Sequence, residues 1–506
     1  DDLKTLDGYT GAWVITGPNT DYTLTNADQT STLEPVNNPN AIFEGSQIGD
    51  YSFSWQLTPT AVDENDVLIE NTGCPPVITP AEVSLPECTT LDFDGVNDFV
   101  SIQDGFADAK TIEMWIYPED SDGVILSGPG VEIRMSDLPT GVTPNSRWYH
   151  IALIGTKLYV DGIDSGTSIN GTGTAGKTII GAKWNASTKA AEDFYSGRID
   201  EVRIWKVNLS EKQLHFMMNQ RLDLASKGSG QIVQGEAVPN LYIDAPSSYH
   251  SDGIHNLDKD DVPFYNVSWD DLIAYYRLIS EFPDPDLNII PNTYKPVGGY
   301  TPDLALTAVD GRLHNMTTHQ QNTSPTPYFS GADGAWDNST TWARPTVWDA
   351  PDSNGFDGTE IEWNIARLNH NINSGNRNII MLGVLSESNL LTINADNALS
   401  ISHYLLLNGN IDLVGESQLL QDHGSILDDS SGGWLQRDQQ GRMSSFNYNY
   451  WTSPVTDQGT TNNSGFTLNK VMLDGTDEDK PQGITWKGQY FAADGSRTSP
   501  ITISDY

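Results

Sequence analysis

Two adjacent acids, Asp200 and Glu201, interrupt the largely apolar segment GRIDEVRIW. Neighbouring side chains on a strand point to opposite faces, so this pair lacks the spacing that two cooperating carboxylates need for glycoside hydrolysis. A carboxylate at the edge of an apolar strand is costly to desolvate unless a cation or hydrogen-bond donors compensate its charge. We therefore expect Asp200 to bind a cation, to pair with Arg198 or Arg203, or to accept hydrogen bonds from the backbone.

The remaining acids and histidines do not form a catalytic pattern. Neither a GxSxG nucleophile turn nor an HExxH zinc motif occurs, and the nine histidines are scattered singly. The nearest pair of acids at a suitable spacing is in TEIEWN, where Glu360 and Glu362 share a strand face but Asn364 occupies the third position. We expect that the chain is not an enzyme.

The charge of the chain argues against several partners. Its 68 acidic residues exceed the 27 basic ones and give a formal net charge of −41, which repels nucleic-acid phosphates and anionic lipid headgroups. Such an excess of carboxylates either keeps a surface protein soluble or attracts hard cations such as Ca²⁺, which prefers oxygen ligands. No apolar run approaches the ~18 residues of a membrane span. We expect calcium as the cofactor, no nucleic-acid partner and no membrane insertion.

The two cysteines, Cys74 and Cys88, flank the proline-rich stretch PPVITPAEVSLPE. They lack the CxxC spacing of metal sites, and two thiols alone rarely hold a metal. A disulfide between them would close a loop of about 15 residues and stabilise the fold by roughly 3 kcal/mol in the chain-entropy model. We expect this disulfide within a linker at 74–88, and therefore an oxidising, extracytoplasmic location.

The strands that would position Asp200 lie in residues 89–225. In TIEMWIYPED both strand faces are apolar, as an inner strand of a sandwich requires. WYHIALIGTKLYVDG indicates a hairpin that turns at Gly155 and Thr156, and Ser210 is placed to cap a short helix. Together with this helix, the ordered motifs LDFDGVNDFV, TIEMWIYPE, WYHIAL, LYVDG and GRIDEVRIW resemble laminin-G/pentraxin-like domains, which have a concanavalin A-type jelly-roll fold.

The resemblance implies a structural calcium site. The aspartate of the GxIDEV motif resembles a calcium ligand in such domains, and this implies the same role for Asp200. Its partner loop would be DFDGVND, in which Asp94, Asn97 and Asp98 supply oxygen donors.

A candidate glycan-binding surface follows in the same domain. Sugar sites on β-sandwiches combine an aromatic ring that stacks on the sugar with polar groups that fix its hydroxyls. The loop GAKWNASTKAAEDFYSG offers Trp184, Asn185 and Tyr195 for these two purposes. Alternatively, the same aromatic side chains pack under the loop as part of the core.

Other segments indicate further β domains. Residues 1–73 alternate in polarity, and GAWVITGPN, NNPNAIFEG and GDYSFSWQL resemble the immunoglobulin-like repeats of giant Bacteroidota surface proteins. Residues 226–330 form a polar, acid-rich linker. In 331–506, short apolar pieces at even spacing predict the rungs of a β-solenoid, with a sandwich as the alternative. FNYNYWTSPV and the ending TISDY resemble the region ahead of the sorting signal of type IX-secreted proteins.

These observations give one interpretation of the whole chain. We expect an all-β, multidomain fragment of an extracellular, cell-surface adhesin that resembles Bacteroidota gliding adhesins. The type IX machinery would be its partner during export. The jelly roll would be a calcium-stabilised head that binds a surface polysaccharide or an extracellular protein, and the other domains would be spacers. The alternatives are a non-catalytic accessory region of a secreted polysaccharide-degrading enzyme and a purely structural stalk.

Overall fold

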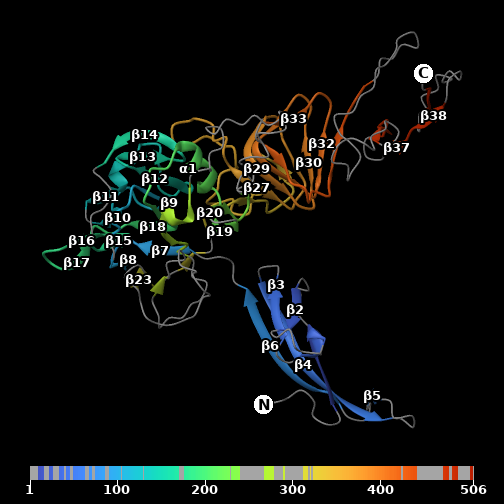
Figure 1. Cartoon of the computed structure of the whole chain (residues 1–506), viewed down its shortest axis with the longest axis horizontal. Helices are drawn as coiled ribbons and strands as arrows, with labels where there is room; N and C mark the ends of the chain where they lie inside the picture. Colours follow the sequence, from blue (N-terminus) through green and yellow to red (C-terminus); the bar gives the residue numbers. More distant parts are fainter. Residues whose placement is uncertain are drawn as a thin grey trace. The chain divides into compact units, whose positions relative to one another are not determined.

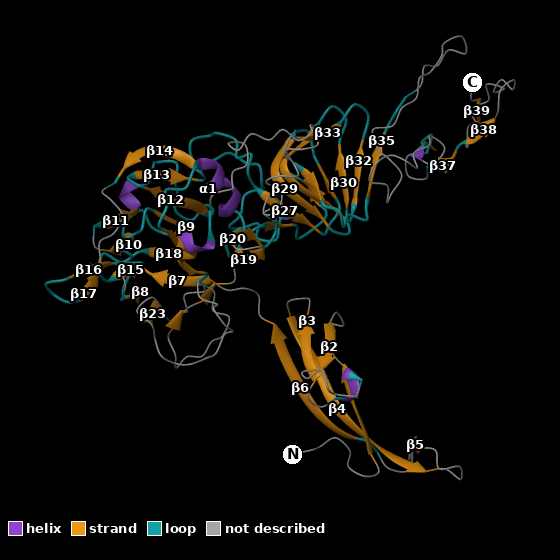
Figure 2. Cartoon of the chain, viewed as in Figure 1, coloured by secondary structure: helices purple, strands orange, loops and turns teal. Residues whose placement is uncertain are grey.

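A computed structural model gives the fold of the chain (Figure 1). It describes residues 9–15, 22–26, 34–38, 41–45, 49–62, 68–70, 75–85, 90–103, 105–128, 130–169, 176–227, 230–239, 267–278, 289–290, 311–316, 319–320, 323–422, 425–440, 471–477, 481–487 and 502–504. These residues are almost entirely strands and loops, with one α-helix among them (Figure 2). The all-β prediction is therefore confirmed. None of the described helices has the length and apolar character needed to cross a membrane.

The chain divides into two compact units, of which the first comprises residues 1–89 with two short later segments. Its longest strand, β4 (Gly49–Val62), pairs antiparallel with β1 (Tyr9–Ile15), β5 (Leu68–Glu70) and β6 (Val77–Leu85). A second antiparallel pair joins β2 (Tyr22–Asn26) to β3 (Ala41–Gly45). Trp13 lies opposite Trp55 on β1 and β4, and their rings meet edge to face at 5.1 Å. Alternating apolar residues thus form the sheet that the sequence predicts for this segment.

The jelly roll begins the second unit and consists of two facing sheets. One has the strand order β14-β13-β12-β9-β18-β7 and is here called the helix-side sheet; the other has the order β11-β10-β15-β8-β23-β22 and is called the outer sheet. Their bounds are β7 Thr90–Asp94, β8 Phe99–Ile102, β9 Thr111–Pro118, β10 Val124–Gly128, β11 Val131–Arg134, β12 Tyr149–Ile154, β13 Lys157–Val160, β14 Ile163–Ser168, β15 Thr178–Ile180, β18 Ser196–Trp205, β22 Ile289–Ile290 and β23 Gly311–His314.

Strands of both sheets come from the segment predicted to be a linker, β22 among them. The strand β21 (Leu272–Tyr276) pairs antiparallel with β18, and β23 pairs antiparallel with β8. Residues 226–330 therefore contribute strands to the domain that precedes them, and the prediction that they form only a linker is wrong.

The core between the two sheets follows from side-chain alternation. On β9, Ile112, Met114 and Ile116 point into this core, whereas Trp115 and Tyr117 belong to a different apolar cluster on the opposite face. Both faces of β9 are thus buried, as predicted.

Local sequence signals set the turn and helix that flank these strands. Gly155 begins the β12–β13 turn with a φ of +62°, which glycine adopts without steric cost. Ser210 caps the helix α1 (Glu211–Met218): its hydroxyl accepts from the Gln213 N–H, and the Gln213 side chain accepts from the Ser210 N–H.

The C-terminal part of the second unit is a β-solenoid, as predicted. One parallel stack contains β25 (Tyr328–Phe329), β27 (Ile365–Leu368), β29 (Ile379–Ser386), β31 (Ala398–Leu407) and β33 (Gln418–Gln421), and the other contains β26 (Gly334–Ala335), β28 (Ile372–Asn373), β30 (Leu390–Ile393), β32 (Asn410–Leu413) and β35 (Trp434–Arg437). Ile372, Leu391, Ile411 and Leu435 occupy equivalent positions in successive rungs. Parallel pairing of this kind excludes the sandwich alternative for residues 328–437.

The solenoid and the jelly roll share an apolar core. Trp115 and Trp148 of the jelly roll lie in the same cluster as Trp336, Trp342 and Ile379 of the solenoid. A second cluster joins α1 and β21 to solenoid residues, Ile365 and Leu382 among them. The face of the helix-side sheet that points away from the jelly-roll core is therefore covered by the helix and the first solenoid rungs.

Candidate functional site

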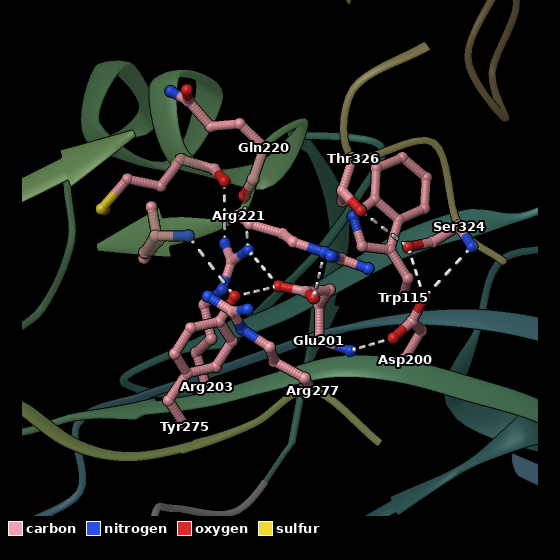
Figure 3. Close-up of polar contacts among 12 residues, drawn as sticks. Trp115, Asp200, Glu201, Arg203, Gln220, Arg221, Tyr275, Arg277, Ser324 and Thr326 are labelled. Atoms are coloured by element: carbon pink, nitrogen blue, oxygen red, sulfur yellow. Dashed lines mark hydrogen bonds and ion pairs between the residues drawn. The ribbon is translucent and has the colours of Figure 1, made fainter. Parts of the chain in front are cut away.

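Asp200 lies on β18, where a bulge interrupts its pairing with β9. The side chain is 2% exposed. One carboxylate oxygen accepts from the Glu201 N–H at 2.9 Å, and the other accepts from the Ser324 N–H at 3.1 Å and the Ser324 hydroxyl at 2.7 Å (Figure 3). Burial, with the nearby charge of Glu201, raises the pKa of Asp200 to about 7. Of the three expectations for Asp200, the structure shows hydrogen bonding to the backbone.

Glu201 takes the bulge position with a φ of +52°. This bulge breaks the strict alternation that the sequence argument assumed. The buried Glu201 carboxylate accepts from Arg203 Nη2 at 2.8 Å and from the Tyr275 hydroxyl, and it lies 3.6 Å from Arg221 Nε. Protein cations and hydroxyls therefore compensate its charge.

Arg203 extends this network to the end of α1. Its guanidinium donates to the carbonyl oxygens of Met217 at 2.8 Å and Gln220 at 2.6 Å. It also lies 3.7 Å from Glu113, which accepts from the indole N–H of Trp205 at 2.9 Å. The network is buried and ties β18 and β9 to the helix. Figure 3 shows its part around Glu201, Arg203 and Gln220.

His150 completes the network on β12. The sequence predicts a packed strand residue, and His150 is 1% exposed with Nε2 3.1 Å from the Glu113 carboxylate. Burial opposes ionisation of Glu113, but the His150 hydrogen bond and the Arg203 charge hold the pKa of Glu113 below its usual value. This network has the character of a structural ion cluster.

The predicted calcium set is not assembled as a whole. Strand pairing places Asp94 opposite Ser196, whereas Asp200 is four residues further along β18. At about 3.3 Å per residue, this separates the two acids by roughly 13 Å along the sheet. The inclusion of Asp200 in a site with Asp94 is therefore wrong, because the Asp200 carboxylate is engaged by Ser324.

Asp94, Asn97 and Asp98 do lie together in the β7–β8 turn. Asp94 Oδ1 accepts from the Val96 and Asn97 N–H groups, and Asp98 Oδ2 accepts from the Asp94 N–H at 3.1 Å. Asp98 is 1% exposed, and its other oxygen has no hydrogen-bond partner among the described residues. Burial raises the pKa of Asp98 to about 6, with Asp94 and Asp92 adding to the shift.

These oxygen donors have the chemistry that Ca²⁺ prefers, so a calcium site at this turn stays a prediction. Within the part of the chain that the structure describes, no group of three or more His, Cys, Asp or Glu side chains is arranged to hold a metal ion. A bound ion at this turn would therefore need backbone or amide oxygens in addition to the two carboxylates.

Of the three predicted glycan-binding residues, Trp184 lies at the surface. It is partly exposed on β16 (Lys183–Asn185), which pairs with β17 (Ala190–Glu192) in a hairpin beside β10. Asn185 stabilises this hairpin: its amide donates to Glu192 at 2.9 Å, and its carbonyl accepts from the Ser187 and Thr188 N–H groups.

The prediction for Tyr195 is wrong. The ring is fully buried and meets Phe93 edge to face at 6.2 Å, and its hydroxyl donates to the Arg198 carbonyl. Side-chain alternation at the start of β18 turns Tyr195 into the core, so it cannot stack on a sugar from solvent.

Sequence reasoning missed the residues that join the jelly roll to the solenoid. Asn219 donates to the Pro325 carbonyl and accepts from the Ile365 N–H at 2.5 Å, and it is fully buried. In the same segment as Pro325, the Thr323 carbonyl accepts from the Trp348 indole at 2.8 Å. These partners lie more than 100 residues from Asn219 and Asp200, and no local signal in the sequence indicates them.

The run GTGTAGKT, residues 171–178, has the spacing of a phosphate loop. A nucleotide-binding loop of this spacing leads into a helix, whose N-terminus receives the phosphate. Here Lys177 and Thr178 lead into the strand β15 instead. The run is therefore not a nucleotide-binding loop of that class.

The cysteines Cys74 and Cys88 lie outside the described residues, so the disulfide stays a prediction.

Comparison with known proteins supports the jelly-roll assignment. Residues 130–215, from β11 to α1, match the family model described as the concanavalin A-like lectin/glucanases superfamily. A solved structure described as that of a candidate carbohydrate binding protein from Bacteroides ovatus aligns at 17% identity, covering 45% of this chain and 84% of that chain, with a TM-score of 0.21. No curated protein shows significant sequence similarity to the chain. The chain is thus similar to this lectin and glucanase superfamily over the middle of its jelly roll.

Proposed function

We propose that this chain is a non-catalytic, glycan-binding region of an extracellular adhesin, with the jelly roll as its binding head. The observation that carries the proposal is the jelly roll itself, whose central segment matches the concanavalin A-like superfamily and whose hairpin presents Trp184 at the surface. The Bacteroides ovatus protein, to which carbohydrate binding is ascribed, is in keeping with this proposal.

Packing restricts where a glycan would bind. The helix-side sheet has its free face covered by α1 and the solenoid, so that face cannot receive a polysaccharide. On the far face of the outer sheet Ser101, Ser127 and Ile179 are buried, so the exposed surface there is formed by the β16–β17 hairpin and by residues nearer the sheet edge such as Phe99 and Arg312. Trp184 supplies the apolar ring there, and sugars stack on such rings through their C–H faces.

Calcium has a structural role in this proposal. An ion held by Asp94, Asn97 and Asp98 would compensate the buried Asp98 carboxylate and fix the β7–β8 turn. The excess of acidic residues over the whole chain favours cation binding in the same way.

The solenoid and the N-terminal sheet would act as spacers on a cell surface reached through type IX secretion. The solenoid is joined to the head by a buried polar and apolar interface, which suits a rigid support. The second candidate is an accessory region of a secreted polysaccharide-degrading enzyme, and the same lectin and glucanase match favours it.

The test is binding of the whole chain to an array of algal, bacterial and host glycans, with calcium and with chelator. A specific signal that a Trp184→Ala variant loses, and that a Trp434→Ala variant on the solenoid keeps, supports the proposal. Trp434 is a suitable control because it is 54% exposed and lies on the last described rung. Absence of any glycan signal in both buffers would contradict it.

A further inference from the structure

The outer sheet carries aromatic and basic side chains on the face that points away from the core. Val100 and Leu313 point inward, so alternation places Phe99 on β8 and both Arg312 and His314 on β23 on the opposite face. Lys177 reaches the same face just before β15, because it lies two residues before Ile179, which pairs with Ser101. We call Phe99, Lys177, Trp184, Arg312 and His314 the basic-aromatic strip.

Direct contacts join four members of the strip into two pairs. The rings of Phe99 and His314 stack at 4.2 Å with an interplanar angle of 8°, and His314 Nε2 lies 2.8 Å from the Ser101 hydroxyl. Lys177 Nζ lies 3.8 Å from the centre of the Trp184 ring. Arg312 and Ile179 both lie opposite Ser101, so they are two strand spacings apart, about 10 Å.

The charges of the strip are not neutralised within the described residues. Most neighbouring cations have carboxylate partners: Arg134 pairs with Glu132 and Asp193, and Lys183 pairs with Glu132. No described carboxylate lies within ion-pair distance of Lys177 or Arg312.

The electrostatic potential at His314 is also positive. Burial lowers the pKa of His314, and the positive charges of Lys177 and Arg312 lower it further. The ring is therefore uncharged at neutral pH and is available as a flat apolar surface beside two cations.

Within the described residues, Lys177 and Arg312 thus place two positive charges without a carboxylate partner on one face of a chain whose net charge is −41. A strongly acidic protein repels polyanions in general, so a ligand that carries carboxylate or sulfate groups would be attracted only where local positive charge outweighs this field. Aromatic rings beside the cations add the stacking surfaces that a sugar needs.

We propose that the basic-aromatic strip binds an acidic polysaccharide, with Lys177 and Arg312 contacting its carboxylate or sulfate groups and Trp184 contacting a sugar ring. This inference rests on the proposed glycan-binding function and names the class of glycan. Adjacent acidic sugars along one chain would meet the two cations in turn, since these lie on different strands of one face.

The experiment compares the binding of the whole chain to dextran, carboxymethyl-dextran and dextran sulfate of equal length, at two salt concentrations. We expect the charged dextrans to bind at least about tenfold more tightly than dextran, with a preference that weakens at high salt. A Lys177→Gln/Arg312→Gln variant should lose most of this preference. The matched control is Lys110→Gln/Lys212→Gln, which removes the same formal charge at exposed positions outside the strip.

Each outcome decides between the two proposals. If neutral array glycans bind but the charged dextrans gain nothing, or if both double variants behave alike, the inference is overturned and the proposed function stands. If neither the array nor the dextrans give a signal, both fail. Inorganic phosphate and sulfate are run as competitors; if either ion alone displaces the charged dextran at low millimolar concentration, the strip is a simple anion site and the acidic-polysaccharide assignment is overturned.

Discussion

Replacing Asp200 with alanine separates a role in domain joining from a role in calcium binding. In the structure its carboxylate accepts three hydrogen bonds, two of them from Ser324, which opens the segment leading to the solenoid. The substitution leaves the buried N–H groups of Glu201 and Ser324 without acceptors, at roughly 1–3 kcal/mol each. The Ser324 hydroxyl lies 3.5 Å from Thr326 Oγ1, so its own loss is smaller.

Relief of the buried charge offsets part of this cost, so we expect a net loss of about 3 kcal/mol for the contact between β18 and residues 323–327. Since 1.4 kcal/mol corresponds to a factor of ten, amide hydrogens in this segment should exchange about 100-fold faster in the variant. Hydrogen–deuterium exchange read by mass spectrometry measures the change peptide by peptide. Asp108→Ala, which removes an exposed acid on the same domain, is the control.

The result should be the same with calcium and with chelator. If Asp200→Ala speeds exchange only in calcium, and leaves the chelated protein unchanged, Asp200 is a calcium ligand and the joining role is refuted. A Ser324→Ala variant should reproduce part of the effect, and the double variant should cost less than the sum of the two, because both changes break the same contact.

Three further predictions concern the β7–β8 turn, the jelly-roll core and the contact between the jelly roll and the solenoid. The pKa of Asp98 is about 6 in the folded state and near 3.8 when unfolded, so between these pH values the folded state binds the extra proton. The stability of the chelated protein, measured by thermal melting, should therefore fall as the pH rises from 4 to 6. Asp98→Asn or added calcium should abolish this fall. Tyr195→Phe should leave glycan binding unchanged, since the ring is buried; a loss equal to that of Trp184→Ala would count against the assignment. Asn219→Ala should destabilise the contact between the jelly roll and the solenoid by roughly 2–4 kcal/mol. Amide hydrogen exchange should then be faster at both 323–330 and 365–368, and unchanged exchange would disprove the bridging role of Asn219.

Periodic patterns made much of the fold predictable. Apolar residues on both faces of TIEMWIYPED, the capping box at Ser210 and the even spacing of short apolar pieces after residue 379 each depend on neighbours within one element or rung. Such local rules give strands, a helix cap and a solenoid, and the structure contains them.

The parts that could not be predicted depend on distant partners. Asp200 is compensated by Ser324, 124 residues away, and the jelly roll gains β21 and β23 from a polar segment that has little pattern of its own. Tyr195 and Trp184 are both aromatic residues in one loop, and only the direction of β18 decides that Tyr195 is buried. Lys177 and Arg312 lie on one face because β15 and β23 pair with opposite edges of β8 in matching register.

The most direct test of the central claim is a hydrogen-exchange footprint of the whole chain with a saturating glycan selected from the array. Binding by the jelly roll predicts slower exchange in residues 176–194 and 311–314, around Trp184 and His314, with the solenoid rungs unchanged. Protection confined to the solenoid, or absent from the outer sheet and its hairpin, would contradict the account.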